Sequence, residues 1–365
     1  MIASLKAVGG RLLRRPRAES VEFLNFAVTF RCNSACTTCD IWRIRDHDEL
    51  SLDEVRRIVG ESEVLSDLGH LALTGGEPSL REDLPELALL FLARRPGLRI
   101  TIPSNALTPD RSLRMLRRIL DAAGPLERPL FLSVSLDGIA DTHDRVRGVP
   151  GNYRKALALL EDAGPLAPAV ERGISFTIVR ENFRDLKLAW RLARDLGVAF
   201  SFQFAAASAT YYAKPDISEL RLRPDELREA ETVIVEIVAE REAGERPLRR
   251  LFAAENDFAA RLVSYQREPR RLSACWSGTH SAYWNPRGEV FPCISLSRAV
   301  GNLRERPFDD IWRGQAAEEA RRAIAARECH CWTPCEALPS LLRDRAVPLR
   351  NAGRLVGLHL GRAVT

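Results

Sequence analysis

The chain has 365 residues and a mass of 40.9 kDa, and its 45% of apolar residues are enough to form a sizeable core. No run of about eighteen or more apolar residues occurs, so the sequence excludes a membrane-spanning helix. The net charge of +5 lies at the ends: residues 1–17 carry five basic residues and no acid, and residues 341–365 carry a net +4, which leaves −4 for the rest. The basic pI of about 8.9 therefore comes from the positive charge at the two ends of the chain. Because the rest of the chain is not basic, no specific nucleic-acid partner is expected.

Six segments rich in apolar and β-branched residues alternate with segments of helical spacing over the first two thirds of the chain. A capping-box pair, Ser51 and Glu54, opens the first helix, and Asp83 is the expected cap of the second. The predicted strands are 23–30, 70–73, 98–102, 130–136, 174–179 and 198–204, and the predicted helices are 51–62, 84–93, 112–122, 153–162 and 185–196.

Strand–helix units in series predict an α/β fold with a parallel sheet and right-handed crossovers. Six units are too few for a closed eight-stranded barrel, so a partial (β/α)6 barrel is expected. The predicted organisation is a basic N-terminal segment (1–20), the barrel core (21–210), a helical connector (211–270), a small cysteine-rich domain (271–340) and a basic C-terminal tail (341–365).

The eight Cys residues fall into two groups, three near the start and five near the end, separated by 235 residues without Cys. The start of the chain lacks the apolar stretch of an export signal, although its Arg-rich, acid-free composition also imitates an organelle transit peptide. The cytoplasm is therefore the predicted location, and cysteine clusters there more often mean metal binding or catalysis than disulfides. Two separate metal or catalytic sites are predicted.

In parallel α/β folds the chemistry lies at the C-terminal ends of the strands, and the unusual residues of this chain follow predicted strands. Cys32 follows the first strand and Gly75-Gly76-Glu77-Pro78 the second. Asn105 follows the third strand, and Ser135 and Asp137 close the fourth. These residues are expected to meet at one end of the barrel.

Cys32, Cys36 and Cys39 place three thiolates within eight residues of one loop. A four-iron cluster takes one ligand per iron, so three thiolates leave one iron open for a small molecule. Zinc would take a fourth protein ligand, and His47 is available eight residues on. The triplet by itself leaves both metals open, and buried core thiols are a third interpretation.

The wider sequence resembles the motifs of the radical S-adenosylmethionine (SAM) superfamily. Residues 29–39 (TFRCNSACTTC) resemble its cluster motif, and residues 74–78 (TGGEP) resemble its SAM-amino-binding motif. Residues 133–148 resemble the fourth-strand segment of the subgroup that carries a SPASM or Twitch auxiliary-cluster extension. One position departs from the pattern, since the residue before the third Cys is often aromatic or large and apolar but is Thr38 here.

The resemblance implies that a [4Fe–4S] cluster on the three cysteines binds SAM through its open iron. It implies that the glycine motif receives the SAM amino group, because Gly75 and Gly76 lack a Cβ and let the backbone approach closely, while Glu77 steadies the loop. It further implies that the ribose hydroxyls and the carboxylate of SAM are contacted by residues drawn from Asn105, Ser135, Asp137 and Arg147. By themselves, Gly75-Gly76 and Asp137-Gly138 would each also fit an ordinary turn.

The second cysteine group begins with Cys275-x17-Cys293, which resembles the opening of the auxiliary-cluster extension. Cys329-x-Cys331-x3-Cys335 follows, so five thiols are available, enough for one auxiliary [4Fe–4S] cluster but not for two. This count matches the shorter Twitch form. The single residue between Cys329 and Cys331 departs from the usual two, so Cys331 and Cys335 are favoured as ligands and Cys329 is the less certain one. A zinc ribbon is the alternative for this block, and a spare thiol would be a hydrogen-atom donor or unused.

The resemblance implies an oxidoreductase-type enzyme that reductively cleaves SAM to a 5′-deoxyadenosyl radical and abstracts a hydrogen atom from a substrate carbon. One electron would come from a donor such as flavodoxin or ferredoxin, and the outcome would be oxidation, epimerisation or a related modification of a small molecule or peptide. The first strand starts too early for a preceding peptide-recognition domain. This favours a small molecule such as a sugar, an aminocyclitol or a lipid head group.

A non-enzymatic iron–sulfur or zinc module, contacting RNA or an anionic membrane through its basic tails, is the competing function. Leucines interspersed with Arg in both tails also permit peripheral membrane contact by an enzyme. Solvated or core-capping helices are the simpler interpretation of the tails.

Overall fold

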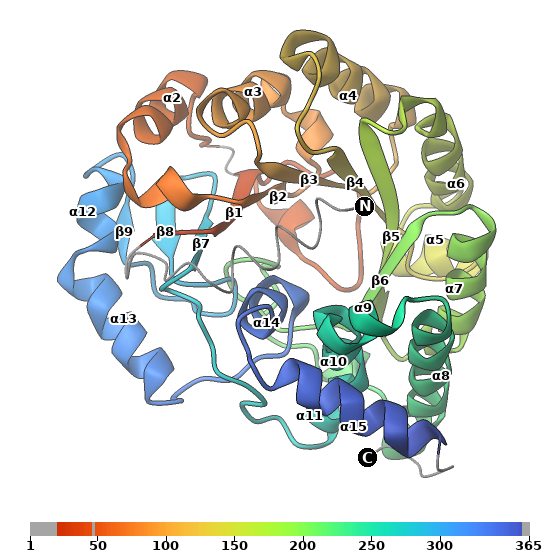
Figure 1. The fold of residues 1–365 in the computed structure, drawn as a ribbon. Helices are drawn as coiled ribbons and strands as arrows, with labels where there is room; N and C mark the ends of the chain where they lie inside the picture. Colours follow the sequence, from red (N-terminus) through yellow and green to blue (C-terminus); the bar gives the residue numbers. More distant parts are fainter. Residues whose placement is uncertain (1–19, 46–47, 360–365) are drawn as a thin grey trace.

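The computed structural model describes residues 20–45 and 48–359, so the basic segment 1–17 and His47 lie outside the described residues. Six parallel strands form one curved sheet in the order β6-β5-β4-β3-β2-β1, open between its two edges (Figure 1). The predicted partial (β/α)6 barrel is confirmed. The strands are β1 (Phe23–Thr29), β2 (His70–Gly75), β3 (Arg99–Ser104), β4 (Leu130–Ser135), β5 (Val170–Ile178) and β6 (Ala199–Phe204).

Helices on the outside of the sheet alternate with the strands, as the sequence spacing predicts (Figure 1). Ser51 and Glu54 form the expected capping box at the start of the first of them. Asp83 stands at the expected N-cap position of α3, but its carboxylate pairs with Arg81 and does not cap the helix. These helices are α2 (Leu52–Glu61), α3 (Leu84–Arg94), α4 (Pro109–Ala123), α6 (Asn152–Asp162) and α7 (Leu186–Asp195), with the short α5 (Asp141–Arg147) after β4.

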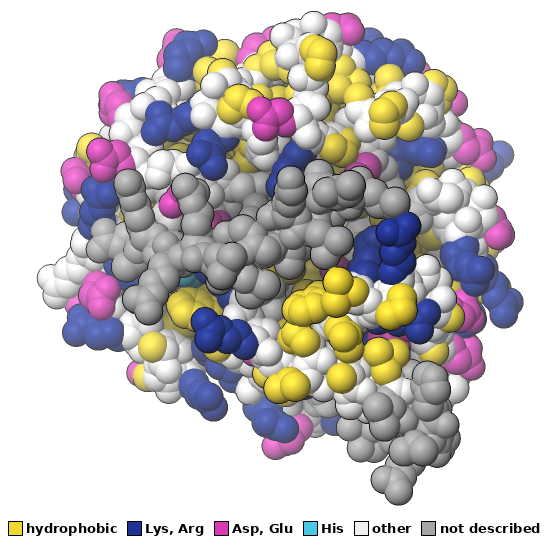
Figure 2. Space-filling view, viewed as in Figure 1, with side chains coloured by type: hydrophobic (Ala, Val, Ile, Leu, Met, Phe, Trp, Pro, Cys, Tyr) yellow, Lys and Arg dark blue, Asp and Glu magenta, His cyan; other side chains and the backbone are white. Residues whose placement is uncertain are grey.

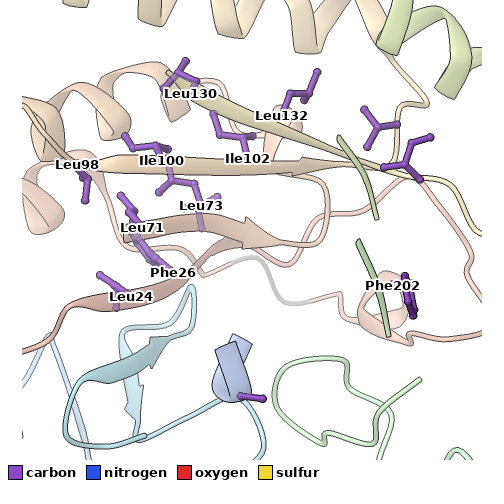
Figure 3. Close-up of a cluster of buried hydrophobic side chains, with 14 of the residues drawn as sticks. Leu24, Phe26, Leu71, Leu73, Leu98, Ile100, Ile102, Leu130, Leu132 and Phe202 are labelled. Atoms are coloured by element: carbon purple, nitrogen blue, oxygen red, sulfur yellow. The ribbon is translucent and has the colours of Figure 1, made fainter. Parts of the chain in front are cut away.

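The two faces of the sheet differ in chemistry. Apolar side chains such as Leu71, Ile100 and Leu132 point from the strands toward the outer helices and form the main core (Figure 3). Along β3 to β6 the buried positions alternate with less buried ones, which is the period of two expected of a strand with one covered face. The less buried positions face the inside of the barrel, and over β4 to β6 they include Ser133, Ser135, Ser175, Thr177, Ser201 and Gln203.

The cysteine-rich region extends the same sheet. β7 (Ser281–Trp284) pairs in parallel with β1, and the antiparallel strands β8 (Glu289–Phe291) and β9 (Gly301–Asn302) follow. The second cysteine group is thereby attached directly to the strand whose end carries the first. The helices that complete this region are α12 (Phe308–Trp312), α13 (Gln315–Ala325) and α14 (Pro334–Leu341).

Five further helices occupy the side of the molecule between β6 and the β7–β8 hairpin (Figure 1). Figure 2 shows acidic and basic side chains mixed over this face, and hydrophobic side chains gathered over the region where α9 and α15 lie. None of the helices in the described ranges is long and apolar enough to cross a membrane. The five are α8 (Pro224–Ala243), α9 (Pro247–Phe252), α10 (Ala254–Ala260), α11 (Leu262–Arg267) and α15 (Val347–His359).

Arginines of the basic C-terminal tail pair with acidic residues of the body. Arg350 donates to Asp257 at 2.8 Å, and Arg343 pairs with Glu22. Arg354 pairs with Glu242 where both side chains are buried. For residues 341–355, these contacts favour the interpretation of the tail as a core-capping helix. Contact of the tails with a membrane stays a prediction.

The Arg354–Glu242 pair makes a testable contribution to stability. We expect Arg354→Ala to lower the free energy of unfolding by about 3 kcal/mol, because it leaves the buried Glu242 carboxylate without its counter-charge. The exposed pair Arg184–Glu229 is the matched control, and Arg184→Ala should cost less than about 1 kcal/mol. Urea unfolding of the three proteins measures both values, and equal losses in the two variants would contradict the structural role of the buried pair.

Candidate active site

The first cysteine loop follows β1 and is fixed along one side by the end of α5. The backbone N–H of Ala35 donates to Arg147 O at 3.2 Å, and the N–H of Thr37 donates to Val146 O at 2.9 Å. Gly148 follows in a left-handed conformation, and a Cβ at this position would lie 2.3 Å from Ala35 O. Only glycine therefore allows this approach of the two backbones.

The glycine motif after β2 fixes the other side of the same loop. Gly76 N–H donates to Thr29 O at 2.8 Å, and Glu77 N–H donates to Arg31 O at 2.8 Å. A Cβ on Gly75 would lie 2.2 Å from Thr29 O, and one on Gly76 would lie 2.2 Å from Arg31 O. In this structure the two glycines are thus required by contact with the cysteine loop itself, a role that the sequence argument did not anticipate.

Glu77 joins this motif to the end of β3. Its buried carboxylate accepts hydrogen bonds from Asn105 N–H at 2.6 Å and from the hydroxyls of Ser79 at 2.7 Å and Ser104 at 3.2 Å. Burial raises the pKa of Glu77, an effect that these donors oppose. Pro78 begins a short 3-10 turn directly after it. The geometry agrees with the expectation that Glu77 steadies the loop.

Asn105 lies beside the first cysteine. Its Nδ2 donates to Asn33 Oδ1 at 2.8 Å and is 3.8 Å from Cys32 Sγ. Its carbonyl oxygen accepts from Asn152 Nδ2 at 2.9 Å. Neither Asn33 nor Asn152 was predicted from the sequence, because Asn33 lies in a loop and Asn152 begins α6, and a single Asn at either place carries no periodic signal.

Asp137 and Arg147 form a buried pair at the end of β4. Arg147 Nη1 donates to Asp137 Oδ2 at 3.1 Å, and the other carboxylate oxygen accepts from Thr177 N–H at 2.6 Å. His143 Nδ1 accepts from Asp137 N–H at 2.9 Å, and burial lowers the pKa of His143 to about 4, so this ring is neutral at neutral pH. Ser135, by contrast, is only half-buried on the inner face of β4. The carboxylate of Asp137 is therefore already engaged by protein donors.

Of the three thiols of the loop, Cys36 is buried, and Cys32 and Cys39 are half-buried. Burial raises the pKa of Cys32 to about 11 and that of Cys39 to about 12, so a bound cation is needed to hold them as thiolates. Over residues 20–45 and 48–359, no three His, Cys, Asp or Glu side chains converge as a site for one metal ion requires. A four-iron cluster needs no such convergence, because each thiolate binds its own iron. Three free thiols on one loop supply one ligand to each of three irons, so this donor set fits a four-iron cluster with one open iron.

Three tyrosines lie between the two cysteine groups, and the sequence argument missed them. Cys39 Sγ is 3.4 Å from Tyr212 O, and the hydroxyl of Tyr211 is 3.2 Å from Thr74 Oγ1. The Tyr211 ring packs edge-on against Tyr212 and Tyr283, with centroids 4.8 and 5.3 Å apart. Tyr211 and Tyr212 are an aromatic pair in a segment without regular spacing, and Tyr283 is a buried residue of β7.

The second cysteine group surrounds a separate pocket. Its lining includes four of the five thiols, Cys275, Cys293, Cys329 and Cys331. Cys335 instead packs at the edge of a small apolar cluster that includes Tyr283 and Tyr211. Burial raises the pKa of Cys331 and of Cys335 to about 12. Four thiols around one pocket fit one auxiliary cluster.

Comparison with known proteins decides the family. The sequence profile of the radical SAM superfamily matches residues 26–179, and the profile of the SPASM iron–sulfur cluster-binding domain matches residues 275–336. The chain belongs to the radical SAM superfamily. The radical SAM profile spans the cysteine loop and the glycine motif, and the SPASM profile spans the five C-terminal cysteines.

Relatives with assigned activities support the same conclusion. The chain is 28% identical to Fe-coproporphyrin III synthase of Methanosarcina barkeri, over 78% of this chain and 72% of the relative. It is 27% identical to PqqA peptide cyclase of Granulibacter bethesdensis, over 81% and 74%. Its fold matches that of SuiB from Streptococcus suis bound to SAM with a TM-score of 0.61, at 14% identity over 88% and 72% of the two chains.

This radical SAM protein is an enzyme that reductively cleaves SAM and uses the resulting radical to abstract a hydrogen atom from a small molecule or peptide. Its cofactors are SAM, a [4Fe–4S] cluster and an auxiliary iron–sulfur cluster. The competing function, a non-enzymatic iron–sulfur or zinc module, is not favoured.

The contact between the glycine motif and the cysteine loop gives a direct prediction. We expect Gly76→Ala to lose about four irons per chain and to reduce 5′-deoxyadenosine formation about a hundredfold, because the new Cβ displaces the loop. Gly60→Ala is the control, since a Cβ there meets nothing within 4 Å. Iron analysis and product assay measure the effect, and a Gly76→Ala protein with full iron content and activity would contradict it.

Proposed function

We propose that this radical SAM enzyme is an oxidoreductase with one auxiliary [4Fe–4S] cluster and a small polar substrate. The observation that carries the proposal is the three-thiol loop, held between the glycine motif and α5 at the end of a barrel whose inner face carries small hydroxyl groups. Three thiolates leave one iron open for SAM beside that polar interior.

We assign the SAM-binding cluster to Cys32, Cys36 and Cys39. The cofactor-binding residues proposed beside it are Gly75, Gly76, Glu77, Pro78, Asn105, Ser135, Asp137 and Arg147. We propose that some of these residues shape the site and that others contact SAM, and the hydrogen bonds support this distinction. Glu77, Asp137 and the Asn105 amide are occupied by protein partners, so they are proposed to shape the site, whereas the half-buried Ser135 is proposed to face SAM.

We assign the auxiliary cluster to Cys275, Cys293, Cys329 and Cys331, because these four thiols line one pocket. Arg271 supports this choice, since its Nη2 lies 3.1 Å from Cys329 Sγ, where its charge would stabilise a thiolate. Cys335 is then the spare thiol, so this proposal departs from the expectation of the sequence, which favours Cys331 and Cys335 as ligands over Cys329. With all four irons ligated by protein, the auxiliary cluster would accept an electron from a substrate radical, which makes net oxidation the proposed reaction.

The barrel interior supports a small substrate rich in hydrogen-bonding groups, such as a sugar, an aminocyclitol or a lipid head group. Inner-face residues of β4 to β6 offer hydroxyls and one amide, and the Gln203 Oε1 atom is buried without a partner. A buried acceptor without a donor costs free energy that a substrate hydroxyl would recover. A peptide is the second candidate, favoured by relatives such as the PqqA peptide cyclase and the mycofactocin maturases.

The electron donor is expected to be a flavodoxin or a ferredoxin, and the cytoplasm is the proposed location. Peripheral membrane contact through the basic tails is proposed mainly for residues 1–20, because three of the four arginines in the described part of the C-terminal tail form internal ion pairs.

Anaerobic reconstitution followed by dithionite reduction with SAM tests the assigned activity. We expect about eight irons per chain and release of 5′-deoxyadenosine from the wild-type protein, because both clusters form. Cys36→Ala should keep about four irons and release none. A wild-type sample with full iron content and no 5′-deoxyadenosine would contradict the proposal.

The same iron analysis distinguishes the auxiliary ligands. Cys329→Ala should lose about four irons, whereas Cys335→Ala should keep about eight. The reverse result would return Cys335 to the ligand set and make Cys329 the spare thiol.

A further inference from the structure

A buried carboxylate lies among the thiols of the second cysteine group. Glu336 is the second residue after Pro334 in α14, is 2% exposed, and lines the same pocket as four of the cysteines. Burial raises its pKa to about 7. A buried carboxylate is costly, and it is more costly beside thiols that become negative when they bind iron. Its presence therefore calls for a compensating role.

The hydrogen bonds of Glu336 reach both ends of the β7–β8 hairpin, which lies between Cys275 and Cys293. Oε2 accepts from the hydroxyl of Ser277, which is two residues after Cys275. The same oxygen accepts from Ser281 Oγ at 3.0 Å, at the start of β7. Oε1 accepts from Ile294 N–H at 3.2 Å, directly after Cys293. One carboxylate thus ties together both cysteine-bearing ends of the hairpin and the helix that follows Cys331.

Docking of α14 does not by itself require a charge here. Ser340 on the same helix accepts from Trp276 N–H at 3.1 Å and donates to Glu336 O at 2.9 Å, so a neutral side chain already connects the helix to the segment around Cys275. Glu336 accepts three further hydrogen bonds on one side chain and, unlike a neutral side chain, places a negative charge beside the cluster pocket.

We propose that Glu336 is a positioning residue for the auxiliary cluster, which gathers the cysteine-bearing segments and lowers the reduction potential of the cluster by its charge. This inference rests on the proposed auxiliary-cluster ligands. A reduced cluster is one electron more negative than an oxidised one, so a neighbouring negative charge disfavours reduction.

Two substitutions separate the two parts of the role. Glu336→Gln keeps a side chain of the same shape that can still accept hydrogen bonds but removes the charge, so it should keep about eight irons and shift the auxiliary potential to a more positive value. Glu336→Ala removes all three contacts and should lose about four irons. Ser281→Ala, which removes one donor and keeps the charge, should keep its iron.

The measurement is a redox titration of the full chain followed by electron paramagnetic resonance, with SAM added to distinguish the first cluster. Glu319→Gln, an exposed carboxylate on α13, is the matched control and should leave the potential unchanged.

A Glu336→Gln protein with the wild-type auxiliary potential would overturn the charge effect, and a Glu336→Ala protein with full iron content would overturn the positioning role. Either result leaves the proposed function intact. A wild-type chain that holds only about four irons would instead overturn the auxiliary cluster and this inference with it.

Discussion

The site depends on two close backbone approaches to the cysteine loop. On one side the glycine motif after β2 donates to the carbonyls of Thr29 and Arg31, and on the other side Gly148 meets Ala35. No side chain fits at either contact. The loop is therefore held from both sides, which places the three thiols at the end of the barrel.

Sheet continuity gives the second cysteine group its place. Because β7 pairs with β1 in parallel, the hairpin that follows Cys275 is built onto the strand that precedes Cys32. The tyrosines at 211, 212 and 283 fill the space between the two groups, and Cys335 packs against the same aromatic cluster. The auxiliary pocket is thus a fixed extension of the barrel.

Local signals in the sequence predicted much of this architecture. The capping box at Ser51, the six strands and the chemistry-bearing residues after them all follow from short-range pattern, and the structure agrees with these. Asp83 is an exception, because its carboxylate pairs with the neighbouring Arg81 and does not cap the helix. The partners of Arg354 and Glu336 could not be predicted, since each contact joins residues far apart in the chain, and neither residue belongs to a motif.

The central claim is that the open iron of the cluster on the first cysteine loop binds the methionine end of SAM. The most direct test is pulsed electron–nuclear double resonance on the reconstituted, reduced enzyme with SAM labelled with nitrogen-15 at its amino group. We expect a hyperfine coupling between the reduced cluster and the label in the wild-type protein. A fully reconstituted and reduced first cluster that shows no coupling to the label would contradict the claim.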